Sequence, residues 1–181
     1  MSSRTETRPY WSIVVLAAAL LMVTMGLRQS QGLFLSPLNT TTGLGIATIS
    51  LAMAIGQFVW GAVQPIAGAI ADRYGPGRVL VGGILLLALG SAITPFMTTS
   101  AGLIFSLGIL VAAGAGAGSF SVLIGSAARH MPPEKRGMGA GIINAGGSFG
   151  QFVFAPITQK LISGFGWMGA MWSIALIALA A

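Results

Sequence analysis

One basic side chain, Arg28, lies within a long apolar stretch of the sequence and is the first candidate for chemistry. An arginine near the middle of a bilayer costs roughly 2.5 to 3.5 kcal/mol on insertion scales, so a compensating interaction is expected. Its guanidinium stays charged and offers forked donors that match a carboxylate. Arg28 is therefore a candidate for binding a small organic anion. The alternative is that it snorkels to the outer interface, because it lies about 25 Å along a helix that starts at Trp11.

Three amide side chains, Gln57, Asn144 and Gln151, are the other candidates for binding a substrate. Gln57 recurs at helical spacing with Gln64 and Gly68, and Asn144 recurs with Gln151, so each set forms a single stripe on its helix. Such stripes could line a wet cavity and hydrogen-bond a substrate. They could equally pack helices together through small and amide residues, and the sequence leaves both interpretations open.

The acidic residues lie outside the apolar stretches: Glu6 in the N-terminal tail, and Asp72 and Glu134 in connections. We therefore expect no carboxylate within these stretches to carry a proton or bind a cation. The chain has no cysteine, and it shows no metal-ligand cluster, nucleophile with a base or phosphate loop. We expect no enzyme activity, no cofactor and no metal site.

The composition indicates a membrane protein. Hydrophobic residues make up 55% of the 181 residues and charged residues 7%, against about 25% charged in soluble proteins. Apolar stretches of about 20 residues can cross the bilayer as helices. We predict an all-α polytopic bundle with a tail over 1–10 and six transmembrane helices in 11–181, over about 11–37, 47–70, 79–97, 101–128, 138–162 and 167–181. The last helix reaches only 15 residues, so the chain is expected to be truncated.

The positions of the basic residues predict the orientation. The net charge of +6 comes from residues scattered through short loops, so no nucleic-acid binding is expected. One predicted side of the membrane holds Arg4, Arg8, Arg73, Arg78, Arg129, Lys135 and Arg136, whereas the other holds Lys160. Because basic loops stay in the cytoplasm, the N-terminus is predicted to be cytoplasmic, in a multi-pass protein of the plasma (cytoplasmic, inner) membrane.

The second connection, residues 68–78, reads GAIADRYGPGR. It resembles the signature loop between helices 2 and 3 of the major facilitator superfamily. Gly68 would allow close helix approach, Asp72 would accept from an arginine or a helix N-terminus, and Gly75 would permit the sharp turn. The predicted gating motif comprises Gly68, Asp72, Arg73, Gly75 and Arg78, together with Arg129 as a possible partner of Asp72. A solvated loop pair is the alternative for Asp72 and Arg129.

A second stretch, from Arg129 to Pro156, resembles the fourth connection and fifth helix of the monocarboxylate transporter and oxalate/formate antiporter branch. The resemblance implies the first half of a twelve-helix fold, a partner C-terminal six-helix half and a central site reached by alternating access. It also implies small organic anions as substrates, with possible proton or counter-anion coupling. The alternatives are a multidrug or sugar carrier of the same superfamily, and a non-transporting half-sized membrane subunit.

Overall fold

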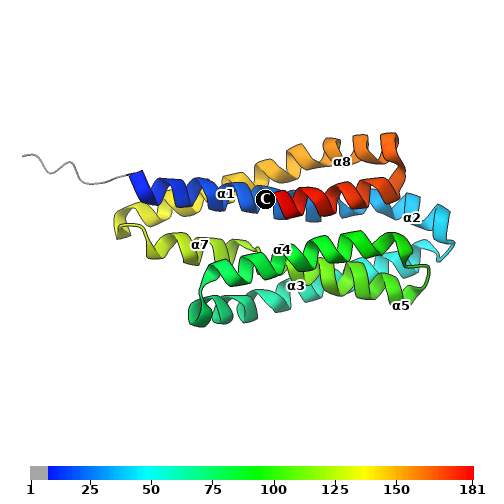
Figure 1. Cartoon of the computed structure of the whole chain (residues 1–181), viewed down its shortest axis with the longest axis horizontal. Helices are drawn as coiled ribbons and strands as arrows, with labels where there is room; N and C mark the ends of the chain where they lie inside the picture. Colours follow the sequence, from blue (N-terminus) through cyan, green and yellow to red (C-terminus); the bar gives the residue numbers. More distant parts are fainter. Residues whose placement is uncertain (1–7) are drawn as a thin grey trace, which may run out of the picture.

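The computed structural model describes residues 8–181, so most of the predicted tail over 1–10 lies outside the described residues. The described part is helical and contains no strand. In chain order its elements are α1 (Arg8–Gln29), η1 (Ser30–Phe34), α2 (Leu35–Thr42), α3 (Ile46–Tyr74), α4 (Pro76–Ile93), η2 (Thr94–Phe96), α5 (Ser100–Leu103), η3 (Ile104–Val111), α6 (Ala112–Ala117), α7 (Phe120–Arg129), η4 (Pro133–Lys135) and α8 (Arg136–Ala180). Figure 1 shows these helices running nearly alongside one another in an elongated bundle.

Five helical stretches in the described residues are long and apolar enough to cross a membrane: Tyr10–Thr42, Ile46–Tyr74, Pro76–Phe96, Ser100–Arg129 and Pro133–Ala180. The fifth is not one straight rod. Gly166, within α8, has φ 69° and ψ 171°, a conformation open to glycine but rare for other residues. Figure 1 shows the chain reversing late in α8, so that its last segment runs back along the bundle.

Glycine also forms the sharp turn between α3 and α4. Gly75 has φ 92° and ψ 143°, and its backbone N–H donates to the carbonyl of Ala71. Pro76 then occupies the first turn of α4, where its missing N–H costs no hydrogen bond. The turn thus places α3 and α4 side by side and antiparallel, with Asp72 and Arg78 at the same end.

Small residues let several helices approach to backbone contact. A Cβ on Gly150 of α8 would lie 2.0 Å from the carbonyl oxygen of Met22 in α1, and one on Gly146 would lie 2.6 Å from that of Ala18. A Cβ on Gly114 of α6 would lie 2.4 Å from the backbone nitrogen of Leu87 in α4. This close approach provides the van der Waals packing that holds helices together in lipid.

The stretch from Ser100 to Arg129 is not a regular helix. Its middle, η3, is a π-helix, and α6 is separated from α7 by Gly118 and Ser119. The Thr24 hydroxyl of α1 donates to the carbonyl of Gly118 at 3.1 Å, which satisfies an acceptor near this interruption. The sequence predicted one continuous helix over 101–128, and the structure divides that range into segments of different geometry.

Candidate functional site

Arg28 lies in the last turn of α1 and is partly buried. Its Nη2 donates to Oε1 of Gln57 in α3. Its Cζ lies 4.2 Å from the ring centroid of Trp60, three residues further along α3, so the guanidinium rests on an aromatic face. One hydrogen bond and one cation–π contact therefore fix a charged group that sits within an apolar helical stretch.

Arg28 borders a cavity of about 140 Å³, lined by Arg28, Gln29, Gln31, Gly32, Met53, Gly56, Gln57 and Ala112. This volume is far above the roughly 10–15 Å³ that a single water requires. Gly32 leaves space there, because an added Cβ would meet no atom within 4 Å. The cavity combines one cation, several amide groups and room for a small polar solute.

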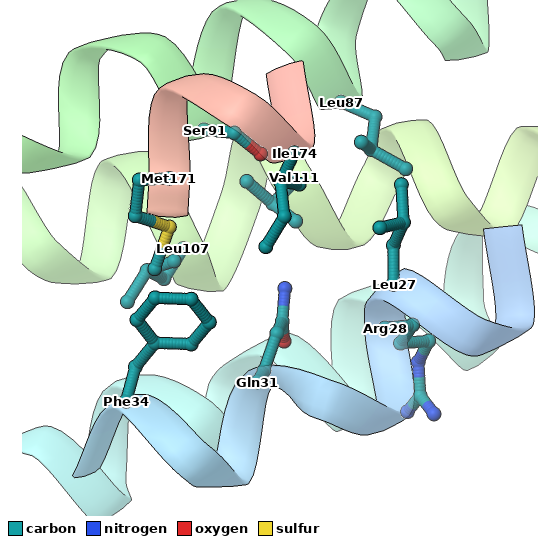
Figure 2. A pocket seen from close by; sticks show the side chains of 10 residues that line it. All are labelled: Leu27, Arg28, Gln31, Phe34, Leu87, Ser91, Leu107, Val111, Met171 and Ile174. Carbon is teal, nitrogen blue, oxygen red and sulfur yellow. The ribbon is translucent and has the colours of Figure 1, made fainter. Parts of the chain in front are cut away.

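A second, much smaller cavity of about 10 Å³ lies on the other side of Arg28 and is mostly apolar. Figure 2 shows the Gln31 side chain pointing into this space, between Phe34 and Leu27, whereas the Arg28 guanidinium points away from it. The two residues thus separate a nearly filled apolar interior from the polar cavity, and the charge of Arg28 faces the polar side.

The structure does not bring all the predicted binding residues together. Arg28 and Gln57, predicted separately, are in direct contact. Asn144 is exposed and Gln151 partly buried, both on α8, and neither lines the cavity beside Arg28. Trp60 was not singled out from the sequence, although it follows Gln57 by three residues and so shares its helical face.

The predicted gating residues gather near Gly75, at the ends of α3 and α7 and the start of α4. Gly68 is the exception: a Cβ added there would meet no atom within 4 Å, so the close helix approach predicted for it is not found. Nη2 of Arg129, the last residue of α7, pairs with Oδ1 of Asp72. Both side chains are well exposed, at 48% and 72%, so the pair lies at a surface of the described chain. The Arg73 guanidinium lies 5.3 Å from the ring centroid of Tyr74 and makes no contact with Asp72 that would compete with Arg129.

Between these two places a third polar contact joins α3 to α7. The Ser121 hydroxyl donates to Oε1 of Gln64 at 3.1 Å. Gln57, Gln64 and Asp72 together form what we call the α3 polar row, which runs about 23 Å along the helix at 1.5 Å per residue. Ser121 was not predicted, because an isolated serine in an apolar stretch carries no distinguishing signal.

Comparison with known proteins identifies the family. The sequence model of the Major Facilitator Superfamily matches residues 12–181. Monocarboxylate transporter 13 of Rattus norvegicus is 27% identical over 169 residues, covering 93% of this chain and 39% of that protein. The oxalate:formate antiporter of Oxalobacter formigenes is 29% identical over 153 residues, covering 84% of this chain and 36% of that protein. Monocarboxylate transporter 11 of Mus musculus is 28% identical over 171 residues, covering 93% of this chain and 38% of that protein.

The chain thus spans less than two fifths of the length of these relatives, at 36% to 39%. The resemblance predicted from the two sequence motifs is confirmed, both for the superfamily and for the monocarboxylate and oxalate/formate branch. The apolar helices agree with an integral membrane protein. The chain belongs to the Major Facilitator Superfamily.

Proposed function

We propose that this chain is the N-terminal six-helix half of a secondary transporter that moves small organic anions, monocarboxylates above all, by alternating access. The observation that carries the proposal is the partly buried Arg28, held by Gln57 and Trp60 at the border of a polar cavity. Gln57 is its one hydrogen-bond partner among the described residues, so donors of the guanidinium remain for a carboxylate. A bidentate pair with that carboxylate would offset the cost of placing the charge in the membrane.

The division of α8 at Gly166 supports six spans. A straight helix of its 45 residues would be about 68 Å long, more than twice the ~30 Å of hydrocarbon. We propose six membrane segments, with 136–165 and 167–180 counted separately and the second about 21 Å long at 1.5 Å per residue. Arg73, Arg78, Arg129, Lys135 and Arg136 would then lie at one side. By the positive-inside rule we propose that this side is cytoplasmic and that the N-terminus lies in the cytoplasm.

A partner half would complete the site. We propose that the C-terminal six helices of the full-length protein close the far side of the cavity and that Asn144 and Gln151 contribute from α8. Asp72 and Arg129 would join α3 to α7 on the cytoplasmic side and separate as that side opens. Because the carboxylates of the described residues, Asp72 and Glu134, lie near the ends of their helical stretches, we propose that a proton-coupling group lies in the partner half.

The test is uptake of labelled monocarboxylates by the full-length protein in proteoliposomes. Arg28→Gln should lower uptake at low substrate concentration roughly 10- to 100-fold, as expected for the loss of a charge-assisted hydrogen bond. Arg28→Lys should be intermediate, because an ammonium keeps the charge but lacks the fork. Lys160→Gln, which removes an exposed cation that does not line the cavity, is the matched control and should transport normally.

Unchanged uptake by Arg28→Gln would contradict the binding role of Arg28. Transport of neutral sugars or lipophilic cations in preference to carboxylates by the unaltered protein would contradict the anion assignment, and would favour a sugar or multidrug carrier. Absence of any transport by the full-length protein would favour a non-transporting subunit.

A further inference from the structure

An open groove runs between α3 and α4, on a face that the polar cavity does not use. Its volume is about 540 Å³ and its walls are mostly apolar, with Ile66 and Ile70 from α3, Gly82 and Leu86 from α4, and Ala113 of α6 at its floor. Ile66 and Ile70 are well exposed, although both are large and apolar. In a bilayer such a groove fills with hydrocarbon.

The groove is polar at one end. Tyr74 and Arg78 complete its lining beside the turn at Gly75. Arg73 lies next to them, stacked on the Tyr74 ring. No acidic side chain lines the groove, and Asp72, the carboxylate nearest in sequence, is paired with Arg129. The end of the groove beside Gly75 therefore carries excess positive charge, and no carboxylate of residues 8–181 pairs with Arg78.

The length of the groove matches one leaflet of a bilayer. Its lining on α3 extends from Val63 to Tyr74, which is about 16 Å at 1.5 Å per residue. Half of a ~30 Å hydrocarbon core is about 15 Å. A chain that lies in the groove from Val63 outward would reach the interface where Tyr74 and Arg78 lie.

We infer that this groove binds an anionic phospholipid, with one acyl chain between α3 and α4 and the phosphate at Arg78. Arginine presents a planar set of donors that matches phosphate, and a basic residue near the surface attracts anionic headgroups. Gly82 leaves space in the groove, because a Cβ there would meet no atom within 4 Å. The inference concerns the face of α3 and α4 that carries the groove and does not depend on which solute the protein transports.

A second apolar groove provides an internal comparison. It measures about 440 Å³ and is lined by residues of α4 and the last segment of α8, among them Leu85, Leu89 and Trp172, with no charged residue in its lining. Acyl chains should occupy this groove without preference for the headgroup. Only the groove that ends at Arg78 should select anionic lipid.

The experiment uses the full-length protein in phosphatidylcholine nanodiscs that contain a small fraction of lipid with a photoreactive acyl chain. The reactive lipid is phosphatidylglycerol in one series and phosphatidylcholine in the other, and labelled peptides are mapped by mass spectrometry. Peptides lining the α3/α4 groove should be labelled about fivefold more by phosphatidylglycerol, as expected for one basic residue at the surface. Peptides lining the second groove should be labelled equally by both lipids.

Two variants test the two parts of the site. Arg78→Gln should abolish the preference for phosphatidylglycerol at the α3/α4 groove while leaving its labelling by phosphatidylcholine unchanged. Gly82→Leu should fill part of the groove and reduce its labelling by both lipids several-fold. Val81→Trp adds bulk to α4 at a residue that is exposed and does not line the groove, and it should label as the unaltered protein does.

Equal labelling of the α3/α4 groove by the two lipids in the unaltered protein would overturn the inference. So would a preference for phosphatidylglycerol that survives Arg78→Gln, or labelling that falls as much with Val81→Trp as with Gly82→Leu. Because Arg78 is exposed, its replacement leaves the helix packing intact and gives a result even if Gly82→Leu fails to fold.

Discussion

Two regions of the molecule hold helices together in different ways. One is the contact of Gly146 and Gly150 in α8 with the backbone of α1, here called the seam, and the other is the α3 polar row. In the seam, Gly146 and Gly150 lie so close to the α1 backbone that even a methyl group would collide with a carbonyl. In the row, each polar side chain of α3 makes one hydrogen bond or ion pair to α1 or α7, and Gly61 and Gly68 of α3 have no neighbour within 4 Å of an added Cβ. Buried alanines of α3 also pack with Val122 of α7. The comparison indicates that the seam is a permanent contact, whereas the row consists of contacts that can separate.

The largest effect is expected in the seam. Gly150→Ala would place a Cβ 2.0 Å from the Met22 carbonyl oxygen, so α1 and α8 would have to move apart. Overpacking of this kind costs about 1–3 kcal/mol and sometimes more. The thermal unfolding temperature of the full-length protein in detergent should therefore fall clearly.

Gly141→Ala is the matched control, because it lies on the same helix and its added methyl group would meet no atom within 4 Å. It should be neutral or slightly stabilising, since alanine favours the helix. If the two variants unfolded at the same temperature, the seam would not be the close contact described here.

A smaller effect is expected in the middle of the α3 polar row. Ser121→Ala removes the hydroxyl that donates to Gln64, a hydrogen bond of 3.1 Å. The loss should lower the free energy of unfolding by about 0.5–1.5 kcal/mol. Chemical denaturation in mixed micelles would measure it, with Ser126→Ala on the same helix as a control. A loss as large as that caused by Gly150→Ala would show that the row is as fixed as the seam.

The smallest effect on stability is expected at the end of the row. Asp72 and Arg129 are both well exposed, and such pairs contribute roughly 0.2–1 kcal/mol. A double-mutant cycle with Asp72→Asn and Arg129→Gln should give a coupling free energy in this range, and it should decrease at high salt. A coupling above about 2 kcal/mol, beyond the usual range for exposed pairs, would mean that another segment buries the pair.

The class of fold follows from the sequence because so few residues are charged. With 7% charged residues and long stretches that lack Asp, Glu, Lys and Arg, the backbone must satisfy its own hydrogen bonds in lipid, and helices do this within one segment. The irregular part, η3 and the interruption at Gly118, was not predictable in this way. Glycines of α6 indicate close packing in either geometry, so their sequence does not distinguish a continuous helix from a divided one.

The candidate site was predictable in its parts but not in its assembly. Arg28 stood out because its burial requires compensation, and Gln57 because an amide is rare in an apolar stretch. Their contact depends on how α1 crosses α3, which neither local sequence specifies. Trp60 was missed because an aromatic residue in a membrane span is ordinarily interpreted as an apolar packing residue. Its cation–π contact with Arg28 becomes visible only in the structure.

The interruption at Gly118 and Ser119 has a mechanical consequence. Before the interruption, α6 is closely packed: a Cβ on Gly114 would overlap the backbone of α4, and a Cβ on Gly116 would overlap the backbone of α3. On the other side α7, ten residues long, carries both Ser121 and Arg129, the α7 ends of two contacts in the row. A bend at this joint would let α7 move relative to α6 and release the Gln64 and Asp72 contacts of the row. Leu123 and Ala127 of α7, which are buried in one cluster with residues of α1 and α8, would have to repack as α7 moved.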